Sequence, residues 1–246
     1  NTPLGADALR STDICDDALR TLSSAGAGLR RVLMLGRRGH VQAAFTIKEL
    51  RELTKLEGAR CLVRAEELEM GRTEASRAVL SKERAKARID ALLSEVAADS
   101  AGFPSDAKAV ELRFLASPVE LLPREDTSDR VGSVVVERNR LTTDPATGRL
   151  VAEGTGEREA IPCGMVLASI GYRSLPLEGV PFDDKLSVVK NQSGRVEGTP
   201  GLYCSGWARR GPSGIIGTNI ADARSTVAAI AEDFGQGAIP QTESPL

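Results

Sequence analysis

Apolar positions along the chain alternate between helical spacing and short unbroken runs, the pattern of a mixed α/β protein. Apolar residues recur at helical intervals over residues 14–22, behind residues 11–13, each of which can cap a helix. Residues 31–35 form an apolar run that ends at Gly36 and is typical of a buried parallel strand. A helix that leads into such a strand predicts half of a βαβ crossover, whose other strand and turn we expect upstream of residue 1.

The same two patterns continue to the end of the chain. Helical spacing predicts helices over residues 46–56, over 73–97 and from about Gly214 onwards. Apolar or β-rich runs predict strands over residues 110–115, 131–141 with a hairpin partner at 149–153, 163–170 and 201–204. Beyond residue 171 the sequence becomes rich in Pro and Gly. We therefore predict one α/β domain over residues 1–171 and part of another over 172–246.

Composition narrows the chemistry that the chain can perform. The 246 residues contain 32 Lys and Arg against 34 Asp and Glu, so no global charge favours nucleic acid or a membrane. Aromatic residues make up only 3% of the chain, which argues against a base-stacking platform. No apolar run approaches the ~20 residues of a membrane-spanning helix, so any membrane contact would be peripheral. The four cysteines are widely spaced, which favours free thiols over a zinc site or a disulfide scaffold.

The single histidine limits nucleophilic catalysis. His40 lies in a glycine-flanked loop, and no serine has the G-x-S-x-G surroundings of a hydrolase nucleophile. A Ser-His-Asp or Cys-His mechanism would have to use this one imidazole. We therefore interpret His40 as a loop residue without a catalytic role, and expect a bound cofactor to supply the chemistry of any reaction.

Two arginines follow the first apolar run, in the stretch Gly36-Arg37-Arg38-Gly39, which we call the basic loop. In dinucleotide-binding folds the end of the second strand faces the adenosine ribose, where an acid favours NAD and arginine accommodates the 2′-phosphate of NADP. Guanidinium donates forked, charge-assisted hydrogen bonds to phosphate. The alternative is an ordinary solvated loop. No G-x-G-x-x-G occurs in the chain, so the pyrophosphate loop would come from residues outside it.

A glycine-rich turn near the end of the chain is the second candidate site. Residues 204–220 contain the only tryptophan and the glycines Gly211, Gly214 and Gly217, ahead of a predicted helix. Free amides at a helix N-terminus suit an anionic ligand edge, such as a flavin ring that becomes negative on reduction. The alternative is a Gly/Pro loop with a half-buried tryptophan.

These stretches together resemble the adrenodoxin reductase family, the mitochondrial-type ferredoxin–NADP reductases. The resemblance is carried by Gly-Arg-Arg-Gly followed by Val-Gln-Ala-Ala-Phe-Thr-Ile-Lys-Glu-Leu-Arg-Glu at 41–52, by Leu-Ala-Ser-Ile-Gly-Tyr at 167–172, and by Pro-Gly-Leu-Tyr-Cys-Ser-Gly-Trp-Ala-Arg-Arg-Gly-Pro-Ser-Gly-Ile-Ile at 200–216. It is strong over residues 32–57 and 161–220 and weak between 60 and 130. It implies a flavoprotein that passes a hydride from NADPH to FAD and single electrons to a small acidic [2Fe-2S] ferredoxin of the adrenodoxin type.

The fold implied by the resemblance is a Rossmann-like NADP-binding domain with a parallel sheet over residues 1–171, and part of an FAD-binding α/β domain over 172–246. Arg37 and Arg38 would hold the 2′-phosphate, and Glu49 would be a further NADP contact, although Thr46 to Glu49 is also a capping-box pattern. His40 stands where many family members have proline. The FAD contacts carried over are Trp207 and the backbone of Gly214, Ile215 and Ile216, with Gly214 also near the nicotinamide.

The family docks its ferredoxin on a basic face, and three arginines of this chain match that face by resemblance. They are Arg51, Arg84 and Arg88. The last two are four residues apart, so on a helix they project from one side. A basic patch speeds encounter with an acidic partner. The alternative for this stretch is a solvated helix face.

Two other functions fit the same residues. One is a related pyridine-nucleotide flavoprotein, such as the small subunit of glutamate synthase, and the other is a non-catalytic nucleotide-binding fragment. We expect the chain to be a piece of a longer protein, and therefore to be inactive alone and to hold neither cofactor tightly. We expect a mitochondrial matrix location in a eukaryote and a cytoplasmic one in a bacterium.

Overall fold

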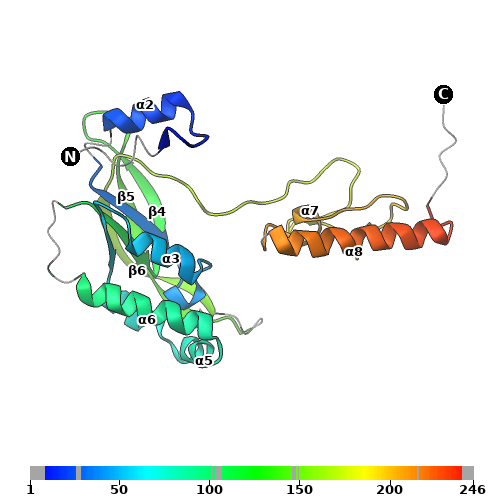
Figure 1. The fold of residues 1–246 in the computed structure, drawn as a ribbon, viewed down its shortest axis with the longest axis horizontal. Helices are drawn as coiled ribbons and strands as arrows, with labels where there is room; N and C mark the ends of the chain where they lie inside the picture. Colours follow the sequence, from blue (N-terminus) through cyan, green and yellow to red (C-terminus); the bar gives the residue numbers. More distant parts are fainter. Residues whose placement is uncertain are drawn as a thin grey trace. The chain divides into compact units, whose positions relative to one another are not determined.

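The computed structural model describes residues 9–25, 29–100, 102, 107–145, 148, 150–214 and 216–239. The chain divides into two compact units, Asn1–Val166 and Leu167–Leu246, which we call the first and second units (Figure 1). The sequence places its domain boundary after residue 171, in the same extended stretch of chain. Each unit is described separately below.

A parallel sheet organises the first unit. Its strands are β1 (Arg31–Gly36), β2 (Arg60–Val63) and β3 (Ala109–Phe114), with β3 in the middle. β1 and β3 run in register, from Arg31 opposite Ala109 to Gly36 opposite Phe114. Because the two strands end at the same level, the segments that follow them leave the sheet side by side.

The parallel strand predicted at residues 31–35 is confirmed, but its predicted burial is wrong. Val32 is 41% exposed and Met34 is 51% exposed. Side chains project from the two faces of a sheet, and the described elements leave the face that carries Val32 and Met34 partly uncovered. The apolar run therefore identified the strand correctly without showing whether both faces are covered.

The helices of the first unit are α2 (Asp16–Ala25), α3 (Ile47–Thr54), α4 (Ala65–Gly71), α5 (Glu74–Lys82) and α6 (Arg84–Asp99), with a 3-10 turn η1 (His40–Gln42). The single helix predicted over 73–97 is two helices, because Glu83 between them is extended, with φ −105° and ψ 93°. The two helices have different neighbours. The buried Ser76 of α5 accepts a hydrogen bond from Gln42 in η1, whereas α6 packs on the parallel sheet.

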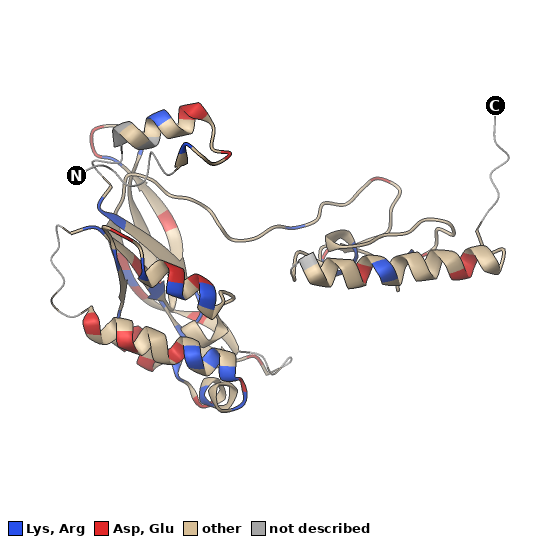
Figure 2. Ribbon diagram, viewed as in Figure 1, with Lys and Arg blue, Asp and Glu red and all other residues tan. Residues whose placement is uncertain are grey.

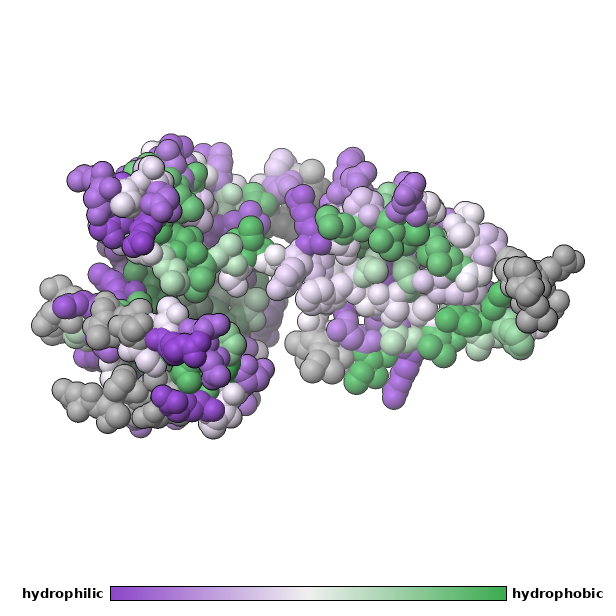
Figure 3. Space-filling model, turned by 90° about the horizontal axis from the view of Figure 1, so that it is seen from above, coloured by the Kyte–Doolittle hydropathy of each residue, from purple (hydrophilic) through white to green (hydrophobic). Residues whose placement is uncertain are grey.

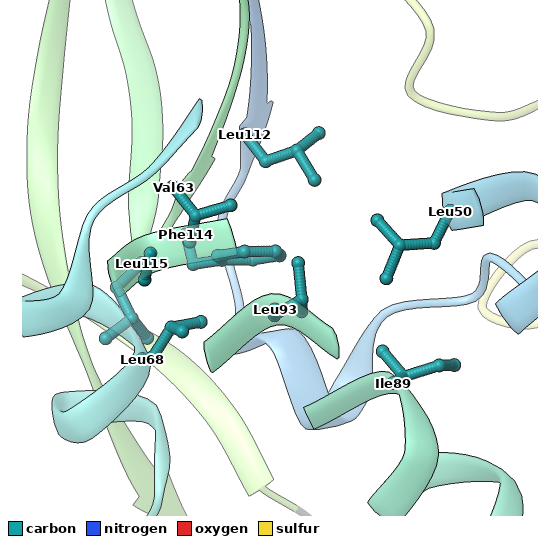
Figure 4. Close-up of a cluster of buried hydrophobic side chains, with 9 residues drawn as sticks. Leu50, Val63, Leu68, Ile89, Leu93, Leu112, Phe114 and Leu115 are labelled. Carbon is teal, nitrogen blue, oxygen red and sulfur yellow. The ribbon is translucent and has the colours of Figure 1, made fainter. Parts of the chain in front are cut away.

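The main core of the first unit lies between α3, α6 and the parallel sheet. Leu93 of α6 has 0% exposure and lies at its centre, with Leu50 of α3, Ile89 of α6 and Phe114 of β3 around it (Figure 4). Complete burial of a side chain of this size contributes about 1.5–3 kcal/mol. This core fixes α3 and α6 against each other and against β3.

An antiparallel sheet follows β3 directly. Its strands are β4 (Ala116–Pro123), β5 (Val131–Thr143) and β6 (Leu150–Pro162), in that order. The predicted hairpin of β5 and β6 is confirmed. The single residue between β3 and β4 is Leu115, which is 2% exposed and has a φ of 55°. A register shift in β5 between Glu137 and Asn139 marks a bulge, which points to Asn139 as an irregular position in the strand.

The second unit consists of short strands and two helices. They are β7 (Phe182–Asp183), β8 (Val188–Val189), β9 (Asn191–Gln192), β10 (Arg195–Val196), α7 (Trp207–Arg210) and α8 (Ile216–Gly235). The final helix is confirmed. The strand predicted over 201–204 is reduced to one isolated bridge, between Arg195 and Tyr203. No helix in the described part of either unit is long and apolar enough to cross a bilayer.

The buried strand predicted over residues 163–170 is wrong. The segment is irregular, with Leu167 82% exposed and Ile170 92% exposed. Apolar composition favours burial, but a strand also needs an edge to pair with, and no described strand pairs with this segment. Apolar residues also reach the surface of the second unit in several places (Figure 3), including Val227 and Phe234 of α8.

Candidate functional site

The basic loop has a fixed backbone and free cationic groups. The carbonyl oxygen of Arg37 accepts a hydrogen bond from Asn139 Nδ2 at 2.8 Å, and that of Arg38 accepts one from the backbone N–H of Leu115 at 3.1 Å. Both arginines are exposed, and no acidic residue in the described part of the chain forms an ion pair with either guanidinium. The two charges are therefore available to an anionic ligand at the carboxyl end of β1.

His40, the residue directly after the basic loop, anchors the end of the loop in the interior of the first unit. Its side chain has 0% exposure, and its Nε2 lies 2.7 Å from Asp90 Oδ1, which also accepts a hydrogen bond from Arg72 Nε at 2.9 Å. The imidazole meets the ring of Phe114 edge to face, with 5.8 Å between centroids. His40 is thus a buried anchor in the structure, and its lack of a catalytic role stays a prediction. Sequence reasoning missed this role because the partner Asp90 lies on a helix far along the chain.

Stability should depend on the protonation of His40. Burial lowers the pKa of His40 below its ordinary 6.5, and the hydrogen bond to Asp90 opposes only part of that shift. The folded protein therefore binds fewer protons than the unfolded chain below pH 6.5, and stability falls as the pH drops from there. We expect a lower denaturant midpoint at about pH 5.5 than at about pH 7.5. The His40→Gln variant should lose part of this difference, and an unchanged pH dependence would contradict the assignment.

Glu49 closes a capping box at the start of α3. Its Oε2 accepts hydrogen bonds from the backbone N–H of Thr46 at 2.6 Å and from the Thr46 hydroxyl at 2.9 Å. The backbone N–H of Glu49 in turn donates to Thr46 Oγ1, so the capping-box interpretation is confirmed. These bonds lower the pKa of the Glu49 carboxyl. Since both use Oε2, the role of Glu49 as an NADP contact stays a prediction that could use the other oxygen.

The three candidate docking arginines lie on neighbouring helices. Arg51 is on α3, and Arg84 and Arg88 are on the first two turns of α6; all three are exposed. The core holds α3 against α6 through Leu50 and Ile89. Figure 2 shows Lys and Arg gathered at the start of α6, with Asp and Glu towards its end. The structure thus brings these arginines onto one helical layer of the first unit.

In the second unit, the glycine-rich turn places Trp207 at the start of α7. The indole is 43% exposed, and its centroid lies 5.8 Å from that of the Tyr172 ring. The turn before it is held by Asp222 of α8, which accepts a hydrogen bond from the backbone N–H of Gly206 and pairs with Arg209 at 3.2 Å. Asp222 was missed from the sequence because nothing in its own neighbourhood marks it as a partner of residue 206.

The start of α8 is also tightly built. Gly214 has a φ of 86°, and a Cβ on it would overlap Thr218 Oγ1, so only glycine fits there. Ile216 begins α8, and Ile215 lies outside the described residues. The backbone of Gly214 is thus placed at the N-terminal end of a 20-residue helix, where an anionic ligand edge is favoured.

A buried ion pair lies behind the basic loop. Arg113 of β3 and Glu67 of α4 are 4% and 5% exposed, and Arg113 Nε donates to Glu67 Oε1 at 2.6 Å. The other oxygen of Glu67 accepts the backbone N–H of Phe114 at 2.7 Å, and Arg113 Nη2 donates to Glu159 of β6 at 2.6 Å. Burial raises the pKa of Glu67 above its ordinary value. The pair borders a cavity of about 180 Å³ and ties both sheets to α4.

No group of three or more His, Cys, Asp or Glu side chains in the described residues could hold a metal ion. The four cysteines are free, as predicted, and burial raises the pKa of Cys61 to about 11.

No family model matches this chain, but several proteins are similar to it over most of its length. The mitochondrial NADPH:adrenodoxin oxidoreductase of Salvelinus fontinalis is 41% identical over 240 residues, 95% of this chain and 46% of that protein. NADPH-ferredoxin reductase FprA of Mycobacterium tuberculosis is 41% identical over 229 residues, 93% of this chain and 48% of that protein. The structure of that FprA in complex with NADPH matches with a TM-score of 0.83 at 37% identity, covering 96% of this chain and 50% of that one. This chain is related to the adrenodoxin reductase/FprA family.

The relationship to the adrenodoxin reductase/FprA family covers half of its members' length. The human NADPH:adrenodoxin oxidoreductase repeats the pattern, with 39% identity over 96% of this chain and 48% of that protein. Within this half, the fold is mixed α/β with a parallel three-stranded sheet, which confirms the fold class at that level. The basic loop and the glycine-rich turn both lie inside the matched region.

Proposed function

We propose that this chain is the NADPH-binding half of a flavoprotein oxidoreductase that passes electrons from NADPH through FAD to a small acidic [2Fe-2S] ferredoxin. The observation that carries the proposal is the pair of exposed guanidiniums of Arg37 and Arg38 at the carboxyl end of β1, with which no acid of the described residues pairs. The first unit would be a Rossmann-like NADP-binding domain, and the second part of an FAD-binding domain. The compartment would be the mitochondrial matrix in a eukaryote and the cytoplasm in a bacterium.

The residues present fit the 2′-phosphate of NADP. Arg37 and Arg38 offer forked donors to a dianion, and hydrogen bonds already hold the backbone beneath them, so only the two side chains have to be ordered at binding. Glu49 would add a hydrogen bond from its Oε1 to the nucleotide. The work of these residues is to bind and orient, and none of them has to move a proton.

The glycine-rich turn fits the edge of a flavin. A Cβ at Gly214 would overlap Thr218, so only glycine allows this turn, and the backbone near it lies at the positive end of α8. Trp207 offers a half-exposed indole face beside Tyr172. A bound flavin supplies hydride acceptance and single-electron release, while Trp207 and the backbone of Gly214, Ile215 and Ile216 would hold it in place.

The direct test is a binding comparison on the 246-residue chain. We expect NADPH to bind measurably more tightly than NADH in calorimetric titrations at the same ionic strength, because only NADPH carries the 2′-phosphate. Equal affinities for the two nucleotides would refute the proposal. Titration with an acidic ferredoxin then separates this function from a related flavoprotein with another electron acceptor.

Reversing the charge on α6 should weaken ferredoxin binding. For Arg84→Glu with Arg88→Glu we expect roughly a tenfold rise in the Kd for an acidic [2Fe-2S] ferredoxin, mostly through slower association. The matched control is Arg124→Glu with Arg140→Glu, which changes the same charge at exposed positions just after β4 and in β5. Surface plasmon resonance at low and moderate salt measures both. If the control variant raises the Kd equally, the effect comes from the net charge of the chain and not from a docking site on α6.

A further inference from the structure

We propose that Asn139 is a positioning residue for coenzyme selectivity, because it holds the basic loop in the shape that presents its two guanidiniums to a 2′-phosphate. The inference rests on the proposed function. Asn139 lies at the bulge of β5, is 2% exposed, and is distant in sequence from the loop. Its side chain does not need to touch the nucleotide, since it acts on the backbone to which the arginines are attached.

The side chain of Asn139 satisfies two acceptors at once. Its Nδ2 donates to the carbonyl oxygen of Arg37 at 2.8 Å and to the hydroxyl oxygen of Ser117 on β4 at 2.7 Å. An amide nitrogen carries two N–H donors, so both bonds form without competition. A carboxylate of the same shape has no donor and would repel the Arg37 carbonyl. The position therefore requires asparagine rather than an acid.

The backbone of Asn139 extends its hold to the second arginine. Its N–H donates to the carbonyl of Leu115 at 2.7 Å, and the N–H of Leu115 donates to the carbonyl of Arg38 at 3.1 Å. Leu115 has a φ of 55°, a conformation that costs a non-glycine residue of order 1–3 kcal/mol unless its surroundings impose it. Here the two backbone hydrogen bonds of Leu115, one from the Asn139 N–H and one to the Arg38 carbonyl, hold this conformation. Both arginine carbonyls thus connect to one residue of β5.

The chain of bonds joins the ends of two strands to the antiparallel sheet. Gly36 of β1 and Phe114 of β3 are paired in register, so Arg37 and Leu115 leave the sheet next to each other. Asn139 bridges both segments from β5. If the Arg37 carbonyl is released, the loop can rotate about its backbone, and forked hydrogen bonds to a phosphate are sensitive to such displacement.

The test compares two nucleotides that differ only in the 2′-phosphate, namely adenosine 2′,5′-bisphosphate and adenosine 5′-monophosphate. Their Kd values are measured by calorimetry on the full chain and on the variants Asn139→Asp, Asn139→Ala and Ser117→Ala. The last variant is the matched control, because it removes the second acceptor of the Asn139 amide and leaves the bond to Arg37 intact. Thermal unfolding of each variant reports whether it is folded at the titration temperature.

We expect the ratio of the two Kd values to shrink about three- to tenfold in both Asn139 variants, the effect of one buried hydrogen bond, and to stay within about twofold in Ser117→Ala. A merely structural role would lower thermal stability and leave the ratio unchanged, which would overturn the inference. If the unmodified chain itself shows no preference for the bisphosphate, the proposed function fails instead. Should Asn139→Ala not fold, the isosteric Asn139→Asp decides alone.

Discussion

Replacing Arg113 by leucine is expected to lower the free energy of unfolding of the first unit by about 3 kcal/mol, because the buried Glu67 loses its closest cation and keeps only Arg64, whose Nε lies 4.0 Å from Glu67 Oε1. The side chains of Arg113 and Glu67 are 4% and 5% exposed, so water cannot solvate their charges. Their hydrogen bond at 2.6 Å takes the place of that solvation. The variant should also lose the tie between β3 and Glu159 of β6. Urea unfolding followed by circular dichroism measures the loss.

Two controls separate the buried pair from arginine loss in general. Arg158→Leu removes an exposed arginine of β6 that pairs with Glu137 of β5. It should lower the free energy of unfolding by less than about 1 kcal/mol. The double variant Glu67→Gln with Arg113→Leu should recover part of the loss, since the carboxylate that has lost its closest cation is then neutral. The pKa of Glu67, already raised by burial, would rise further in Arg113→Leu, so that variant should lose more stability as the pH rises above 4.5. A loss equal to that of Arg158→Leu would contradict this account.

The Arg37→Ala, Arg38→Ala double variant should bind NADPH about 100-fold more weakly, because each of the two charge-assisted interactions with the 2′-phosphate is worth roughly 1.4 kcal/mol. Its affinity for NADH should change little, because NADH has no 2′-phosphate. Both guanidiniums are exposed and unpaired within the described residues, so their removal should leave stability nearly unchanged. Parallel titrations with the two nucleotides give the selectivity directly.

The control for this variant is Arg124→Ala with Arg140→Ala, which removes the same charge from exposed positions just after β4 and in β5. It should retain the preference for NADPH. An equal loss of NADH affinity in Arg37→Ala, Arg38→Ala would show that the loop acts on the whole nucleotide. The basic loop would then not be a 2′-phosphate site.

Local patterns predicted the elements whose causes are local. The strand at residues 31–35, the hairpin of β5 and β6 and the capping box of Thr46 and Glu49 depend on residues close in sequence, and the structure confirms them. The interruption at Glu83 could not be predicted this way. It separates two helices that pack against different neighbours, and the polar sequence around it favours helix on both sides.

Elements that depend on distant partners were missed or wrongly assigned. β2 is only four residues long and β4 follows β3 after one residue, so neither has a periodic pattern of its own. Residues 163–170 had the composition of a buried strand but no partner among the described strands. Composition describes a preference for burial, whereas pairing is decided by the rest of the fold.

The candidate site divides in the same way. Arg37 and Arg38 could be chosen as candidates because their charge, their glycine neighbours and the preceding strand are adjacent in sequence, and their binding role stays a prediction. The groups that support them were not, since His40 depends on Asp90 and the loop backbone depends on Asn139. Nothing in the sequence around Asp90 or Asn139 marks either residue as a support of the loop. Only the folded structure brings them into contact with it.

The first turns of α6 carry cations where a helix by itself favours anions. Arg84 and Lys86 lie in the first turn, where the peptide dipoles are positive, and Arg88 lies in the second. The N-cap residue Glu83 is acidic, but its side chain caps no backbone N–H, and the first turn itself contains no acid. Such placement lowers helix stability by about 0.3–1 kcal/mol per charge. An acidic surface lying there would relieve this internal repulsion as well as meet the arginines. The N-terminal end of α6 therefore carries an unfavourable electrostatic energy, which an acidic surface bound there would reduce.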